Sequence, residues 1–132
     1  MLRAEPDGIV RGELGLVGDP LPARPPLLIG AMSVGRIPVV APVAAGPLNV
    51  NADEAAAALA VGLGAERLLF VTDVPGVLVE DDVVSSIDVD DADRLLDEGA
   101  FDGGIVPKLR AAVHAAREGV HAEIGETAVV RR

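Results

Sequence analysis

The residues from Ile37 to Asp73, IPVVAPVAAGPLNVNADEAAAALAVGLGAERLLFVTD, decide the fold class of this chain. Ile37–Ala41 is a β-branched run that is apolar on both faces, which predicts a central parallel strand. Ala52–Leu63 is rich in alanine and predicts a helix. Arg67–Val71 predicts a second buried strand, and the order strand, helix, strand is typical of a parallel α/β sheet.

The sequence on either side of this stretch extends the same rhythm. It predicts a strand around Leu14–Val17, a short helix from Pro25-Pro26 through Ser33, an extended piece at Val77–Val79, helices over Asp90–Glu98 and Ile105–Glu118, and a last strand pair at Val120–Ile124 and Thr127–Val130. We therefore expect an α/β fold with an open, mostly parallel sheet and helices on both faces. The length of 132 residues fits a single domain over residues 1–132.

The composition excludes several classes of function. No cysteine is present, which removes disulfide frameworks, cysteine zinc sites and thiol catalysis. The chain has 21 acidic and 11 basic residues, a net charge of −10, so we expect neither nucleic acid nor a membrane surface as a partner. Because it has no signal-peptide pattern and no apolar run of about 18 residues, we expect a cytoplasmic protein.

Few residues offer metal or acid–base chemistry. His114 and His121 are expected to be structural or exposed. The acidic clusters Glu80–Asp82 and Asp88–Asp93 are expected to be solvated faces and a helix N-terminus, so no metal site is predicted.

Three polar segments follow predicted strands or begin a predicted helix: Leu48–Glu54, Thr72–Leu78 and Asp102–Lys108. Ligands of open α/β sheets bind beyond the carboxyl ends of the strands, where such segments converge. In the third segment, Gly103 and Gly104 allow a close backbone approach, and the helix start offers N–H donors and a positive dipole end. Lys108 can reach the same anion from one turn inside the helix, which suggests a phosphate site; a glycine-rich loop with a surface lysine is the alternative.

The other two segments can also be interpreted as purely structural. Asn49, Asn51 and Asp53 suit helix capping and Asx-turns, or one Asn caps while the other binds a polar ligand and Asp53 orients a cation. Thr72–Gly76 suits either a strand-to-turn exit or a binding loop.

Taken in order, four segments resemble the acetylglutamate kinases, which belong to the amino acid kinase fold family. They are Gly35–Pro42 (GRIPVVAP), Leu48–Asp53 (LNVNAD), Thr72–Leu78 (TDVPGVL) and Gly103–Lys108 (GGIVPK). The resemblance runs from about Leu14 to Gly119. It implies transfer of the γ-phosphoryl group of ATP, with Mg²⁺, to the side-chain carboxylate of N-acetyl-L-glutamate, a step in arginine biosynthesis.

The resemblance also implies roles for individual residues. Asn49 and Asn51 would bind the amino-acid substrate, Asp53 would hold the catalytic lysine in place, and Lys108 would stabilise charge on the moving phosphoryl group. The ATP pocket would be formed by Thr72, Asp73, Val74, Pro75, Gly76, Val77, Leu78, Phe101, Asp102, Gly103 and Gly104.

One part of the family pattern has no counterpart. Members begin with a strand, a lysine and a Gly-Gly loop, and nothing before Leu14 matches these. The chain therefore resembles the C-terminal, nucleotide-binding half of the fold, with the N-terminal half missing. We expect a homo-oligomer or association with that half; the alternatives to catalysis are a nucleotide-binding fragment or an interaction module.

Overall fold

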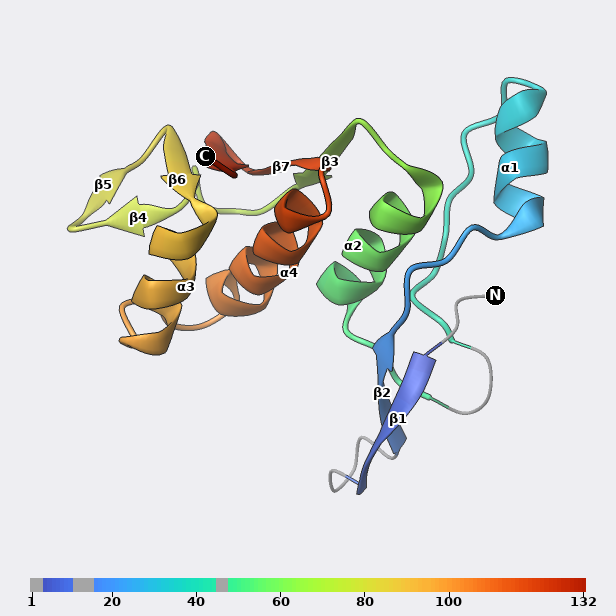
Figure 1. Ribbon diagram of the computed structural model, residues 1–132, viewed down its shortest axis with the longest axis horizontal. Helices are drawn as coiled ribbons and strands as arrows, with labels where there is room; N and C mark the ends of the chain where they lie inside the picture. Colours follow the sequence, from blue (N-terminus) through green and yellow to red (C-terminus); the bar gives the residue numbers. More distant parts are fainter. Residues whose placement is uncertain (1–3, 11–15, 45–47) are drawn as a thin grey trace. The chain divides into compact units, whose positions relative to one another are not determined.

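The computed structural model describes residues 4–10, 16–44 and 48–132 and divides the chain into two compact units (Figure 1). Unit 1 spans Met1–Leu63 and unit 2 spans Gly64–Arg132. Each unit is described by itself. The expectation of a single domain stays a prediction.

The described residues of unit 1 form a strand pair and two helices. Strand β1 (Ala4–Val10) pairs antiparallel with β2 (Leu16–Pro20), and helices α1 (Pro26–Ser33) and α2 (Ala52–Leu63) follow. Both helices occupy the predicted ranges. Part of the strand predicted at Leu14–Val17 lies outside the described residues, and the structure extends the strand to Pro20; β1 was not predicted.

Small residues allow α2 to pack closely inside unit 1. Ala23, Ala44 and Ala55 form a buried cluster, and Leu48, Val50 and Leu59 pack against it. A Cβ atom added at Gly62 would overlap the backbone of Ala23, so only glycine fits this approach.

The central strand predicted at Ile37–Ala41 is wrong. The structure gives this segment irregular backbone, with Ile37 92% and Val39 98% exposed. Pro38 lacks the N–H that a β-ladder would use, and no described strand pairs with the segment.

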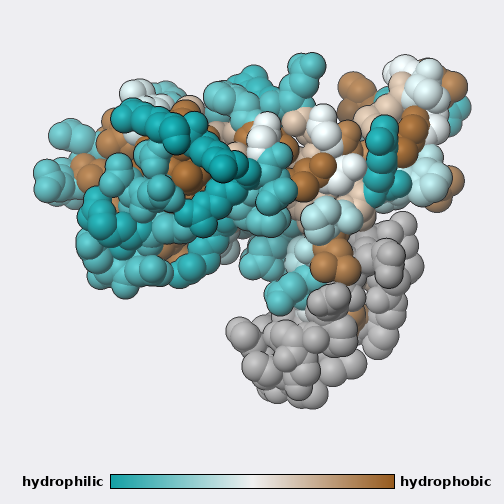
Figure 2. All heavy atoms as spheres, viewed as in Figure 1, coloured by the Kyte–Doolittle hydropathy of each residue, from teal (hydrophilic) through white to brown (hydrophobic). Residues whose placement is uncertain are grey.

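Helix α1 also buries none of its residues, and Figure 2 shows apolar side chains around it. Unit 1 therefore presents an exposed apolar surface.

Unit 2 is built on a four-stranded sheet. Its elements are β3 (Arg67–Phe70), β4 (Leu78–Val79), β5 (Asp82–Val83), β6 (Ser86–Asp88), α3 (Val89–Asp97), α4 (Ile105–Arg117), β7 (His121–Ile124) and β8 (Thr127–Val130). The strand order is β3-β7-β8-β6. The pairs β3–β7 and β6–β8 are parallel, whereas β7–β8 is antiparallel. The predicted α/β class with a mostly parallel sheet is confirmed.

Helices α3 and α4 pack against each other and against this sheet (Figure 1). Helix α4 supplies Leu109 and a row of buried alanines to the core, where Ile124 and Val129 of the sheet are also buried. Strand β3 lies at the sheet edge, and Leu69 is 46% exposed. The predicted strand at Arg67–Val71 is therefore present, but its expected burial is wrong. Strand β6 was not predicted.

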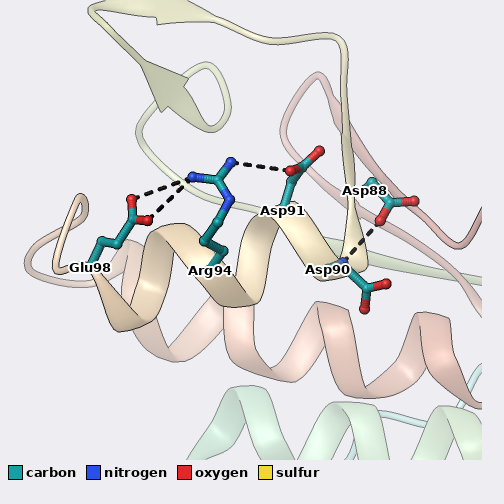
Figure 3. A network of polar contacts seen from close by, with 5 residues as sticks. All are labelled: Asp88, Asp90, Asp91, Arg94 and Glu98. Atoms are coloured by element: carbon teal, nitrogen blue, oxygen red, sulfur yellow. Dashed lines mark hydrogen bonds and ion pairs between the residues drawn. The ribbon is translucent and has the colours of Figure 1, made fainter.

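The acidic run before α3 forms the start of that helix, as predicted (Figure 3). The Asp88 carboxylate accepts a hydrogen bond from the Asp90 N–H at 3.0 Å, and this bond is the largest cause of the lowered pKa of Asp88. Arg94 pairs with Asp91 at 3.1 Å and Glu98 at 3.4 Å on the exposed face. These exposed ion pairs add little stability. No helix in the described ranges has the length and apolar character to cross a membrane.

Candidate functional site

A cavity of about 570 Å³ lies within unit 2, beside the N-terminus of α4. We call it the α4 pocket. Three pieces of chain form it: the segment from β3 to β4, the β4–β5 turn, and the segment leading into α4. Its lining residues are Thr72, Asp73, Val74, Gly76, Leu78, Glu80, Asp81, Ala100, Phe101, Asp102, Gly103, Gly104, Ile105 and Lys108. Its volume is in the usual range for small-molecule sites.

The α4 pocket brings together two of the three segments singled out in the sequence. Thr72–Leu78 and Asp102–Lys108 are about 30 residues apart in the chain, yet both line this one cavity. Of the predicted ATP-site residues, Pro75 and Val77 are not among those lining it. Val77 is fully buried, and the Pro75 carbonyl accepts a hydrogen bond from the Glu126 N–H at 2.8 Å.

The start of α4 gives the pocket its positive character. No side chain caps this helix, so the first backbone N–H groups face outward at its positive dipole end. Gly103 has a φ of +62°, which a side chain would strain, and Gly104 has no neighbour near the position of a Cβ. Lys108, in the first turn of α4, lines the same cavity and is half-buried. This arrangement suits an anionic group.

Carboxylates line other parts of the pocket. Asp73 follows β3, and the Thr72 hydroxyl donates a hydrogen bond to it at 3.3 Å. Glu80 and Asp81 form the β4–β5 turn with positive φ values of 50° and 69°. Carboxylates accept hydrogen bonds from hydroxyl and amino groups. The pocket therefore suits a ligand that is anionic at one part and carries hydrogen-bond donors at another.

Sequence reasoning missed Glu80, Asp81, Ala100 and Ile105 as lining residues. Asp81 was interpreted as a solvated loop tip, and both turn residues are exposed, but the hairpin also places them along the wall of the cavity. The Glu80-Asp81 pair carries no glycine or asparagine that would signal a hairpin turn with positive φ. Within the described part of the chain, no group of three or more His, Asp or Glu side chains could hold a metal ion.

The other predicted site residues lie in unit 1, at the start of α2. The Asn51 side-chain oxygen accepts hydrogen bonds from the N–H groups of Asp53 at 2.9 Å and Glu54 at 3.2 Å, which is the geometry of a helix cap. The Asn49 carbonyl accepts a hydrogen bond from the Gly18 N–H at 3.0 Å. Asp53 is half-buried in the first helical turn. Proximity of these residues to Lys108 stays a prediction.

Carboxylates also gather at the start of α2, and two of them, Asp19 and Glu54, were given no role in the sequence analysis. Burial, and then the charges of Asp19 and Asp53, raise the pKa of Glu54.

The histidines fall outside these sites. Both side chains are exposed, as predicted, and His121 Nε2 lies 2.8 Å from a carboxylate oxygen of Glu123. Hydrogen bonds from Arg67 and then from His121 lower the pKa of Glu123.

Comparison with known protein families identifies the chain. Residues 3–125 match the model of the amino acid kinase family. The chain belongs to the amino acid kinase family. Acetylglutamate kinase from Roseiflexus sp. is 48% identical to this family member over 114 residues, which cover 84% of this chain and 44% of the relative. Acetylglutamate kinase from Rubrobacter xylanophilus is 48% identical over 127 residues, which cover 94% of this chain and 49% of that relative. This amino acid kinase chain thus spans about half the length of the curated relatives it matches.

Solved structures show the same fold. A protein from Streptococcus mutans UA159 superposes with a TM-score of 0.87 at 26% identity, covering 99% of this amino acid kinase chain and 57% of that chain. N-acetylglutamate synthase from Neisseria gonorrhoeae, complexed with coenzyme A and L-arginine, gives a TM-score of 0.79 at 22% identity. The match covers 99% of this chain and 36% of the synthase chain. Carbamate kinase from Giardia lamblia bound to citric acid gives a TM-score of 0.67 at 21% identity, and the match covers 100% of this chain and 51% of the carbamate kinase chain.

Proposed function

We propose that this chain supplies the nucleotide-binding part of a kinase that transfers the γ-phosphoryl group of ATP to the side-chain carboxylate of N-acetyl-L-glutamate. The observation that carries the proposal is the α4 pocket, in which Lys108 and the uncapped start of α4 line one cavity with Thr72–Leu78. The names of the relatives at 48% identity support the choice of acceptor. By the same relationship, the protein would act in arginine biosynthesis in the cytoplasm.

The chemistry requires positioning and positive charge more than proton transfer. A carboxylate oxygen of the acceptor attacks the γ-phosphorus, the bond from phosphorus to the β–γ bridging oxygen breaks, and ADP leaves with that electron pair. The product is an acyl phosphate. The acceptor carboxylate is already ionised at neutral pH, so no general base is needed. Charge on the transferring group is stabilised by the Lys108 ammonium and by the α4 N–H groups.

The remaining predicted residues would complete the site. Segments Thr72–Leu78 and Phe101–Gly104 would hold the nucleoside, with carboxylates accepting hydrogen bonds from its hydroxyl and amino groups. Asn49 and Asn51 would bind the acetylated amino acid, and Asp53 would hold Lys108 in place. Asn51 already caps α2, so its contribution would be to fix the end of that helix.

The magnesium ion fits this proposal as part of the nucleotide complex. Mg²⁺ is usually held by substrate phosphates and by one or two carboxylates, which agrees with the lack of a three-ligand cluster among the described residues. Asp102, which lines the α4 pocket directly before Gly103, is the carboxylate nearest in sequence to the proposed phosphate-binding residues. When bound, the ion supplies further positive charge to the transferring group.

A second function is a nucleotide-binding or interaction module without catalysis. It is favoured by one observation: the α4 pocket, which is the candidate nucleotide site, lies within unit 2. The family resemblance assigns a second lysine and a Gly-Gly loop to the other half, so binding and turnover can be separated experimentally.

Calorimetric titration with Mg·ATP tests the binding part. We expect wild-type protein to bind ATP, and Lys108→Ala to weaken binding at least about tenfold, because a charge-assisted contact contributes about 1.5–3 kcal/mol. Arg110→Ala is the matched control, since it removes an exposed cation from the same helix without changing a pocket residue. Equal weakening by both variants would show a general charge effect and contradict the site.

Acyl phosphate formation tests the catalytic part. The product is trapped with hydroxylamine, using the chain alone and the chain mixed with the N-terminal half of the Rubrobacter xylanophilus relative. Turnover in either sample, lost in Lys108→Ala, supports the kinase. ATP binding without turnover in both samples favours the second function.

A further inference from the structure

The β7–β8 turn and the start of β8 contact the chain between β3 and β4 and the β4–β5 hairpin, which both line the α4 pocket. The β7–β8 turn contains Gly125, Glu126 and the first residue of β8, Thr127. Thr127 is completely buried, with 0% of its surface accessible to solvent. It is the one buried polar residue among the described residues. A buried hydroxyl at such a position requires hydrogen-bond partners.

Both partners of the Thr127 hydroxyl are backbone groups at the base of the β4–β5 hairpin. The hydroxyl accepts a hydrogen bond from the Val77 N–H at 2.9 Å and donates one to the Val84 carbonyl at 2.6 Å. The Val84 N–H in turn donates to the Val77 carbonyl at 3.0 Å. Thr127 therefore holds the two ends of the hairpin whose turn places Glu80 and Asp81 on the pocket wall.

The turn residues Gly125 and Glu126 contact the end of β3 and the segment between β3 and β4. The Gly125 N–H donates to the Phe70 carbonyl at 3.3 Å, and the Glu126 N–H donates to the Pro75 carbonyl at 2.8 Å. Gly125 has a φ of +55°, and a Cβ atom there would overlap the Pro75 carbonyl oxygen. A Cβ atom at Gly76 would come within 2.5 Å of Thr127 Oγ1. The two segments thus lie in direct contact.

We propose that Thr127 is a positioning residue for nucleotide binding, because its hydroxyl fixes the backbone at Val77, between the pocket residues Gly76 and Leu78, and at Val84. This inference rests on the proposed function. Val77, between two lining residues, is buried and does not line the cavity itself. Thr127 touches the loop and is not among the residues that line the pocket.

The decisive variants differ only in the hydroxyl group. Thr127→Val keeps the shape of the side chain and removes both hydrogen bonds, whereas Thr127→Ser keeps the hydroxyl. We expect Thr127→Val to raise the Kd for Mg·ATP about tenfold, which corresponds to about 1.4 kcal/mol. Thr127→Ser should remain within about twofold of wild type. Val129→Ala is the stability control, because it removes buried apolar volume from the same face of β8 and leaves the Thr127 hydroxyl in place.

Loss of ATP affinity in Thr127→Val but not in Val129→Ala, at comparable loss of thermal stability, supports the proposal. Equal affinity of Thr127→Val and wild type, or equal weakening in all three variants, overturns it. If Thr127→Val does not fold, the Kd for Mg·ATP is compared between Gly125→Ala and wild type. The Cβ added at Gly125 would push the Pro75 backbone away from the β7–β8 turn.

Hydrogen exchange of the Val77 amide in ligand-free protein separates this proposal from the proposed function. The amide should exchange at least about tenfold more slowly than the exposed amides of the β4–β5 turn in wild type and in Thr127→Ser. Fast exchange of Val77 in wild type would overturn the positioning role even if ATP binds. Slow exchange together with no ATP binding would overturn the proposed function and, with it, the role in nucleotide binding.

Discussion

Substituting alanine for Gly76 tests the contact between the pocket loop and the β7–β8 turn. The added Cβ would lie 2.5 Å from Thr127 Oγ1, 3.0 Å from Val83 Cγ1 and 3.4 Å from the Thr127 nitrogen. The first distance is shorter than real Cβ contacts allow. Thr127 cannot move away freely, because its hydroxyl is fixed by hydrogen bonds to Val77 and Val84.

The cost of Gly76→Ala follows from these contacts. Adding a methyl group to a well-packed site costs about 1–3 kcal/mol, and displacing the hydroxyl would weaken hydrogen bonds that contribute about 1 kcal/mol each. We expect a loss of about 2–3 kcal/mol in the free energy of unfolding. For a chain of 132 residues this lowers Tm by roughly 6–15 °C.

Thermal unfolding followed by circular dichroism measures this loss. Gly30→Ala is the matched control, because Gly30 lies inside α1 and has nothing within 4 Å of a built Cβ. That substitution should raise stability by about 0.5–1 kcal/mol, since alanine has the higher helix propensity. A Gly76→Ala protein as stable as wild type would refute the packing argument for the loop.

Three further predictions concern unit 1. Asn51→Ala should lower the free energy of unfolding by about 1 kcal/mol, because it removes the oxygen that caps α2. Asn51→Asp should keep most of this stability, because an aspartate oxygen can also cap the helix. Denaturant unfolding measures both variants. Glu54→Gln should stabilise the protein at pH 7 but not below about pH 4, because the raised pKa of Glu54 makes its ionised form unfavourable in the folded state. The same unfolding experiment at both pH values checks this, and equal gains would count against it. Replacing Ile37 and Val39 together with lysine should shift the protein from oligomer to monomer in sedimentation velocity, because both are almost fully exposed. A wild-type protein that is already monomeric at high concentration would exclude that interface.

Local sequence signals predicted the helices well. Helix α2 has the predicted bounds, since its alanine-rich composition and the Asn51 cap act within the segment itself. Helix α1 begins at Pro26, where a proline is tolerated in the first turn. The start of α4 after Gly103 and Gly104 was predicted because glycine conformation is equally local.

Strand burial was predicted less well. Ile37–Ala41 has the composition of a central strand, but the structure pairs it with no described strand and leaves Ile37 and Val39 exposed. Arg67–Val71 forms a strand at an edge. A strand is stabilised only by a partner that is distant in sequence, so apolar composition alone does not determine its place in a sheet.

The amino-acid sequence by itself specified where the helices begin and end to within one residue, and it located the glycines and the lysine that give α4 its anion-binding character. The tertiary structure alone decided that Thr72–Leu78 and Asp102–Lys108 share one cavity, that Glu80 and Asp81 line it, and that Thr127 holds its loop. The difference has a physical cause. Helix caps and glycine turns depend on neighbouring residues, whereas a cavity and a buried hydroxyl depend on backbone groups that only folding brings together.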